Sequence, residues 1–168
     1  ECGAQINHLN AKEETPVIVA YSHGHTQLAE YLVDRGADLN IGSSPALHWA
    51  ATNGFTDVAL LLIEKGGDIN VRSRCGYTPL YSACRRGSTD VVRALIDRGA
   101  DVNACVSTDA RTALHTATVN GFVEIAEILL KNGARVNAVS TSGYSPLHFA
   151  FKKTRTDGGR IAKMLVEH

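Results

Sequence analysis

The stretch Thr78-Pro79-Leu80-Tyr81-Ser82-Ala83 decides the fold, because copies of it recur along the chain. The clearest copies are Thr112-Ala113-Leu114-His115-Thr116-Ala117 and Ser145-Pro146-Leu147-His148-Phe149-Ala150. Earlier copies are Pro45-Ala46-Leu47-His48-Trp49-Ala50 and the degenerate Thr15-Pro16-Val17-Ile18-Val19-Ala20. The closing alanines stand at 20, 50, 83, 117 and 150, so the period is 30 to 34 residues. Self-similarity at a fixed period of this size predicts a repeat architecture.

A second sequence motif recurs with the same period. Its copies are Gly36-Ala37-Asp38-Leu39-Asn40, Gly66-Gly67-Asp68-Ile69-Asn70, Gly99-Ala100-Asp101-Val102-Asn103 and Gly133-Ala134-Arg135-Val136-Asn137. Gly3-Ala4-Gln5-Ile6-Asn7 fits the same pattern, which we interpret as the tail of a preceding repeat. The glycines predict left-handed turns that end helices.

Each copy predicts two helices. Thr78, Thr112 and Ser145 stand where the first helix begins, and their hydroxyls can accept from an unpaired backbone N–H. Val58, Leu61 and Leu62 show the helical spacing of the second helix. One helix pair cannot bury its apolar face alone, so stacking of neighbouring pairs must supply the core.

These residues resemble the ankyrin repeat, whose period is about 33 residues and whose signature is T-P-L-H-x-A. The resemblance covers essentially the whole chain. It implies an all-α solenoid of stacked helix-turn-helix units with β-turn fingers, in which the fingers and first helices form the concave side. The expected units are residues 1–7, the tail of a preceding repeat, and repeats 8–40, 41–70, 71–103, 104–137 and 138–168.

Three departures from the pattern carry structural expectations. The finger between Asn40 and Pro45 is three residues short, which predicts a notch in the row of fingertips. The finger before Thr112 has one extra residue, and Ala110 holds the usual position of the turn glycine. The last repeat has a three-residue insertion, which predicts a longer loop over residues 152–159, and it is truncated at its end. The missing polar capping repeats and the absent initiator Met lead us to expect a piece of a longer array.

Composition narrows the function. The 168 residues include 17 Lys and Arg against 17 Asp and Glu, so the net charge is zero. A general nucleic-acid or membrane-surface binder is usually strongly basic, and the longest apolar run, Val58 to Ile63, is far below the roughly 20 residues of a membrane span. We therefore expect neither nucleic-acid binding nor membrane insertion.

The four cysteines have no metal-binding or disulfide-scaffold spacing. Free thiols in a reducing compartment are the simpler interpretation of Cys2, Cys75, Cys84 and Cys105, which predicts an intracellular, cytoplasmic protein, with the nucleus as an alternative.

The sequence argues against an enzyme. His48, His115 and His148 all hold the fourth position of the signature, and this regularity favours a structural hydrogen-bonding role over chemistry. Cys84 is expected to be a small buried residue. The sequence contains none of the motifs GxSxG, HExxH, P-loop or GxGxxG. We expect no enzyme activity, no metal and no cofactor.

The charge pattern suggests a binding surface. In the family the usual contact positions are the fingertips and the exposed face of the first helix, and here the charged residues at these positions are seven Lys or Arg against two acidic residues. The acidic residues gather on the second helices: Glu30, Asp34, Asp57, Glu64, Asp90, Asp97, Glu124 and Glu127. The resemblance then implies a module that binds an acidic or phosphorylated protein segment. The expected contact residues are Arg74, Tyr77, Arg85, Arg86, Arg111, Asn120, Tyr144, Lys152 and Lys153.

Two other functions remain open. The repeats could be a structural spacer within a longer array. They could also be the regulatory or targeting domain of an enzyme, a channel or a ubiquitin-ligase adaptor encoded outside this fragment.

The resemblance further implies a modification. Many ankyrin repeats are substrates of a 2-oxoglutarate-dependent asparaginyl hydroxylase, and the preferred context resembles the surroundings of Asn40, Asn70 and Asn103. Asn137 departs because Arg135 replaces the acidic residue. The alternative is that each Asn only hydrogen-bonds the finger backbone, as Asn does in turns.

Overall fold

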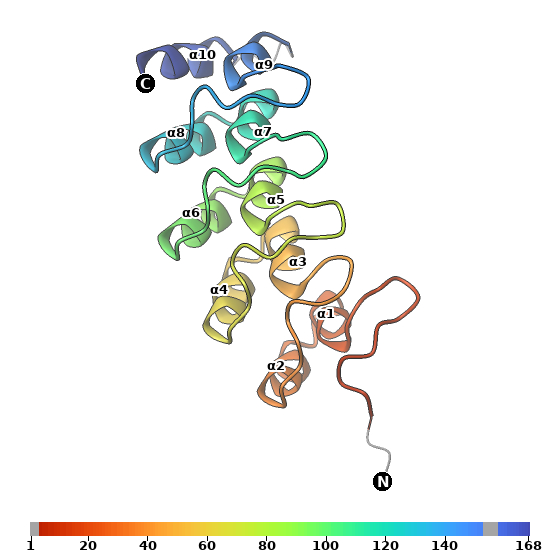
Figure 1. Cartoon of the computed structure of the whole chain (residues 1–168). Helices are drawn as coiled ribbons and strands as arrows, with labels where there is room; N and C mark the ends of the chain where they lie inside the picture. The colour runs from red at the N-terminus through yellow and green to blue at the C-terminus, as the bar shows by residue number, and fades with distance from the viewer. Residues whose placement is uncertain (1–3, 153–157) are drawn as a thin grey trace.

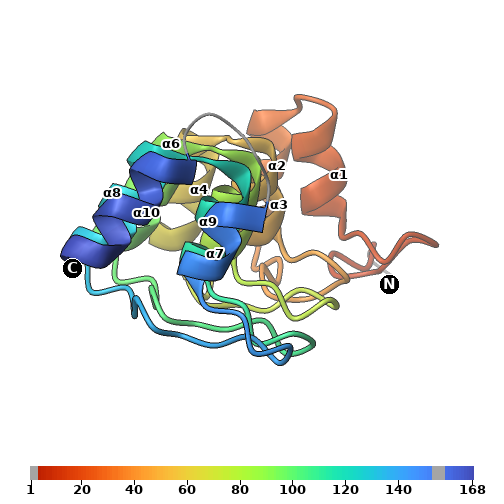
Figure 2. The same ribbon diagram turned by 90° about the horizontal axis from the view of Figure 1, so that it is seen from above.

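The computed structural model describes residues 4–152 and 158–168, with only the backbone of Lys152. Within these ranges the secondary structure is helical, and the helices form stacked antiparallel pairs with loops that project to one side (Figure 1, Figure 2). The first helices of the pairs are α1 (Pro16–Ser22), α3 (Ala46–Asn53), α5 (Pro79–Arg86), α7 (Ala113–Asn120) and α9 (Pro146–Lys152). The second helices are α2 (Thr26–Asp34), α4 (Thr56–Glu64), α6 (Thr89–Asp97), α8 (Val123–Lys131) and α10 (Gly158–Glu167). This is the predicted all-α solenoid.

The starts of the first helices follow the expected capping. The hydroxyls of Thr15 and Thr78 accept from the backbone N–H three residues later, at 3.3 and 3.2 Å. Thr112 forms a capping box with His115. In α3, Pro45 holds the capping position and supplies no side-chain bond.

The predicted helix stops are confirmed. Gly36, Gly66, Gly99 and Gly133 all have φ between 82° and 90°, the left-handed region that glycine enters without a steric penalty. Ala110, expected at the turn-glycine position of its finger, also has a positive φ of 54°.

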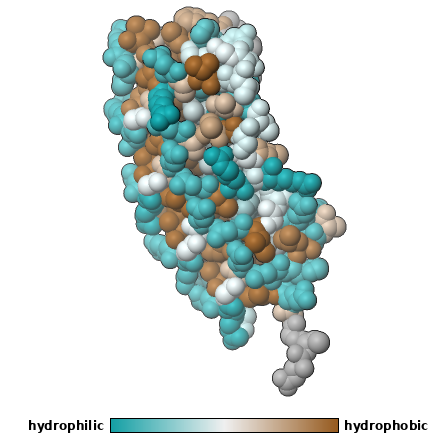
Figure 3. All heavy atoms as spheres, in the orientation of Figure 1, coloured by the Kyte–Doolittle hydropathy of each residue, from teal (hydrophilic) through white to brown (hydrophobic). Residues whose placement is uncertain are grey.

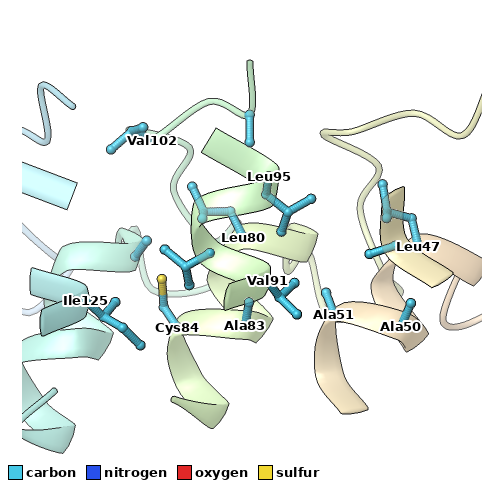
Figure 4. Close-up of a cluster of buried hydrophobic side chains, with 14 of the residues drawn as sticks. Leu47, Ala50, Ala51, Leu80, Ala83, Cys84, Val91, Leu95, Val102 and Ile125 are labelled. Carbon is cyan, nitrogen blue, oxygen red and sulfur yellow. The ribbon is translucent and has the colours of Figure 1, made fainter. Parts of the chain in front are cut away.

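The core runs the length of the stack, between the first and second helices. Leu47, Leu80 and Leu114 hold the same position of successive repeats and are fully buried. Cys84 is also fully buried, and Figure 4 shows it lying between Ala83 and Ile125. Burial raises the pKa of its thiol, which fits the expected role as a small apolar residue.

Asparagine side chains connect successive repeats. The Oδ1 atoms of Asn40, Asn70 and Asn103 accept the backbone N–H of Asp68, Asp101 and Arg135, at 2.9, 2.9 and 2.8 Å. Asn7 makes the same bond to the N–H of Asp38, at 2.8 Å. The described residues of the N-terminal tail, 4–7, therefore hold the register of a repeat.

The loop of the last repeat is shorter at both ends than expected. Lys152 still belongs to α9, and α10 already begins at Gly158. Gly158 is buried against the backbone of Ala150, where a side chain would collide with the Ala150 carbonyl oxygen. The middle of the predicted loop, including Lys153, lies outside the described residues.

Candidate partner-binding groove

The fingers and the first helices form one surface, called the groove from here on. It contains a pocket of about 360 Å³ between the short finger (residues 41–44), the next finger (residues 71–77) and helices α3 and α5. Its lining consists of Ser43, Ser44, His48, Thr52, Ser73, Arg74, Cys75, Tyr77, Ser82, Arg85 and Arg86. In Figure 3 the finger side is strongly hydrophilic near the middle of the array and close to neutral toward the C-terminal end.

The pocket lies where the short finger was expected to leave a notch. Main-chain bonds still connect the fingers across it, because Ser43 N–H donates to the Glu13 carbonyl and Arg74 N–H donates to the Ser43 carbonyl, at 3.2 and 3.0 Å. The Arg74 side chain then reaches past the short finger to the carboxylate of Glu13, at 2.9 Å. The missing three residues thus bring together two side chains that are 61 positions apart.

Arg85 and Arg86 form one wall of this pocket from the last turn of α5. Both side chains are exposed, and cations at a helix C-terminus complement the helix dipole. The Arg85 guanidinium lies 5.6 Å from the centre of the Tyr77 ring, which in turn stacks on Tyr81 at 4.9 Å. Among the residues that the structure describes, neither arginine has a carboxylate partner.

His48 lies at the base of the pocket and is 8% exposed. Its Nδ1 is 2.9 Å from the Ser44 hydroxyl and its Nε2 is 2.8 Å from the Ser82 hydroxyl. Burial, followed by the positive charge of Arg85, lowers the pKa of His48 to about 4. The ring is therefore neutral at pH 7, so one nitrogen donates to a serine and the other accepts from the second serine.

The other signature histidines differ from His48. The Nδ1 atoms of His115 and His148 accept from the backbone N–H of their own capping residues, both at 3.1 Å. The structural role predicted from the signature therefore holds for both. The Ser82 contact of His48 could not be found from the repeat pattern, because it joins two repeats through a serine that the signature leaves variable.

Three other predicted contact residues already have partners within the chain. Arg111 pairs with Asp109 at 3.2 Å, and its guanidinium lies 4.8 Å from the centre of the Phe149 ring. Asn120 donates to the Thr116 carbonyl at 2.9 Å. Tyr144 packs against His148 and Phe149.

The structure does not describe the side chain of Lys152 or any atom of Lys153, so the proposed contact role of both residues stays a prediction.

The second helices carry less unpaired acidic charge than the sequence suggests. Asp34, Glu64, Glu124 and Glu127 pair with basic residues of the same helix, an adjacent helix or a helix end. These basic residues are Lys65, Arg98, Arg93 and Lys131, at 2.6, 3.3, 2.7 and 2.7 Å. Half of the eight acidic residues expected on the back of the solenoid thus lie in ion pairs, so this surface is less strongly acidic than the sequence suggests.

The described residues, 4–152 and 158–168, offer neither a metal site nor a membrane span. No group of three or more His, Cys, Asp or Glu residues in these ranges could hold a metal ion. Every helix in the same ranges is too short or too polar to cross a bilayer.

The comparison with known families agrees with the geometry. The family model described as "Ankyrin repeats (3 copies)" matches residues 2–73, 44–104, 65–140 and 105–168. A search of curated proteins found no match. The overlapping family matches cover nearly the whole chain, and the structure shows the helix pairs and fingers in register throughout the described residues. The chain therefore belongs to the ankyrin-repeat family.

Proposed function

We propose that this chain is a non-catalytic module that binds an acidic or phosphorylated segment of another protein in the groove. Ankyrin repeats are generally protein–protein interaction modules. The acidic or phosphorylated character of the partner is inferred from Arg85 and Arg86. Both line a pocket of the groove, and neither has a carboxylate partner among the described residues. Arginine is over-represented wherever carboxylate or phosphate is recognised, because its planar fork donates two parallel hydrogen bonds.

In this proposal the chain acts as a scaffold or adaptor inside the cell, in the cytoplasm or alternatively the nucleus. The tyrosine at the pocket supports it, since aromatic residues and Arg are the residue types most enriched at binding hot spots. Tyr77 is already ordered by its stack on Tyr81, so little side-chain freedom is lost when a partner packs on it.

The test is affinity capture with the purified chain, compared with the double variant Arg85→Glu/Arg86→Glu. Charge reversal should abolish partner capture, because each change replaces a donor by a repelling carboxylate. A matched control is Arg135→Glu/Lys163→Glu, which makes the same charge change at exposed residues outside the pocket.

Stability separates binding from folding. Surface substitutions usually change the free energy of unfolding by less than about 0.5 kcal/mol, so both double variants should keep the helical circular dichroism and the melting temperature nearly unchanged. Full retention of captured partners by Arg85→Glu/Arg86→Glu would refute the basic-groove proposal and favour the spacer function. A large loss of stability would show that the arginines are structural.

A further inference from the structure

The lining of the pocket has a consistent chemistry. Three guanidinium groups, those of Arg74, Arg85 and Arg86, meet the hydroxyl-bearing side chains of Ser43, Ser44, Thr52 and Ser73. Among the described residues, none that lines the pocket carries a carboxylate. Guanidinium groups have no acceptor atoms, and hydroxyls can donate, so the lining is suited to a ligand group made of acceptors.

The charges of the pocket are not equivalent. Arg74 is offset by Glu13, with 74% of the Arg74 side chain and 46% of the Glu13 side chain exposed. Arg85 and Arg86 have no such partner in the part of the chain that the structure describes. Two uncompensated positive charges therefore face the pocket.

We propose that the pocket receives the phosphate group of a phosphoserine or phosphothreonine in an extended segment of a partner protein. The inference rests on the proposed function and narrows it from acidic segments in general to phosphorylated ones. A phosphomonoester carries a charge of about −1.5 to −2 at pH 7 and offers three strong acceptor oxygens. A carboxylate carries a single charge on two oxygens, which would leave one of the two free arginines uncompensated.

The base of the pocket is ordered in the ligand-free chain. The pocket has a volume of about 360 Å³ and extends from the fingertip at Arg74 to the imidazole of His48. Ser44 and Ser82 fix that imidazole from both sides, so the base of the pocket is held before a ligand arrives. Such pre-organisation lowers the entropic cost of binding.

In the ligand-free chain the Glu13 carboxylate pairs with Arg74, at the place where a phosphate oxygen would bind. Exposed ion pairs of this kind are weak, so a phosphate can replace the carboxylate. Release of Arg74 would then add a third guanidinium to the site. The Glu13 contact makes the proposal testable by a variant that strengthens binding.

The experiment uses fluorescence anisotropy of the purified chain. The probe is a fluorescein-labelled degenerate peptide pool with a central phosphoserine, alongside the same pool with an unmodified serine and a third pool with a central glutamate. The variants are Arg86→Gln, Arg85→Gln and Glu13→Gln. Arg135→Gln serves as the matched control, since it removes one exposed arginine outside the pocket.

The phosphoserine pool should bind more tightly than the other two pools. Arg85→Gln and Arg86→Gln should each weaken it by about tenfold or more, the size of a lost charge-assisted hydrogen bond. Glu13→Gln should strengthen it by roughly 1.5- to 5-fold, and Arg135→Gln should leave it unchanged. The ring signals of His48 in an NMR titration should shift with the phosphoserine pool and stay in place with the serine pool.

The remaining outcomes overturn the inference in distinguishable ways. If the phosphoserine and glutamate pools bind equally and both lose affinity in Arg86→Gln, the groove is a general acidic-segment site, so the proposed function survives and the phosphate inference fails. If inorganic phosphate competes as strongly as the phosphoserine pool, the site holds a free anion and no peptide. If no pool binds while affinity capture still depends on Arg85 and Arg86, the partner carries another acidic group. If capture is also unaffected by these arginines, the proposed function fails as well.

Discussion

Replacing Ala110 by glycine should stabilise the array. Ala110 has a φ of 54°, whereas the equivalent positions of the fingers on either side are Gly76 and Gly143, with φ of 76° and 78°. A left-handed conformation costs an L-residue with a Cβ about 1–2 kcal/mol. Glycine removes that cost but adds about 0.5–1 kcal/mol of entropy to the unfolded chain. The net gain expected for Ala110→Gly is about 0.5–1 kcal/mol.

The two neighbouring fingers supply the reverse experiment. At Gly143 an added Cβ would meet no atom within 4 Å, so Gly143→Ala should cost about 0.5–1 kcal/mol, the reverse of the gain expected for Ala110→Gly. At Gly76 the same Cβ would lie 2.8 Å from Oγ of Ser107 and 3.2 Å from its backbone nitrogen. Gly76→Ala should therefore cost more than Gly143→Ala, because the next finger must move in addition.

Urea titrations followed by far-ultraviolet circular dichroism measure all three changes. The midpoint should rise for Ala110→Gly, fall for Gly143→Ala and fall further for Gly76→Ala, with the slope m unchanged, since m depends on the surface exposed on unfolding. A lower midpoint for Ala110→Gly would refute the assignment of strain to this finger. Equal midpoints for the two alanine variants would show that the contact with Ser107 carries no weight.

Three further predictions concern the core, the pocket and the inter-repeat bonds. Leu114→Ala should destabilise the array by about 2–5 kcal/mol in the same titration, because Leu114 is 0% exposed, and an effect within error would mean that the repeat register is wrong. The pKa of His48 is lowered to about 4 from 6.5, so its neutral form contributes about 3 kcal/mol at pH 7 that is lost as the pH falls from 6.5 through 4. His48→Gln should flatten the dependence of unfolding free energy on pH between 7 and 4, and an unchanged slope would contradict this. Incubation with the asparaginyl hydroxylase should modify Asn40 first and Asn137 last by mass spectrometry, since Asn40 precedes the short finger beside the degenerate first repeat. Preferential modification of Asn137 would overturn the ranking, and no mass shift at any Asn would remove the hypothesis.

The sequence predicts the fold well because the repeats share the same short-range signals for where helices begin, pack and end. The capping residue at Thr78, the periodic apolar side chains and the glycine stop at Gly99 each act within one repeat, and the period sets how the repeats stack. Even the strained Ala110 follows from its alignment with the turn glycines. The short-range physics of one unit therefore extends to the whole array.

The candidate site was less predictable, because it depends on a departure from the period. The notch could be predicted from the short finger, and Arg85 and Arg86 could be predicted as contact residues, but not that both lie at the notch. The bond between Arg74 and Glu13 could not be predicted, because the two residues belong to repeats that are separated by a whole repeat. The pairing of Arg111 with Asp109 was equally hidden, because the repeat signature does not fix the side-chain directions within a finger.

The asparagine bonds between repeats have a consequence for how the length of such an array can change. In each bond the asparagine Oδ1 accepts a backbone N–H of the following repeat. The same bond forms whether that N–H belongs to Asp68, Asp101 or Arg135. A repeat inserted or deleted as a whole would meet the same donor at the same distance, so the new joint would need no matching side chain. A change by part of a repeat would instead leave one asparagine facing the wrong peptide unit. The array can thus grow or shrink in whole units while the side chains that face a partner vary independently.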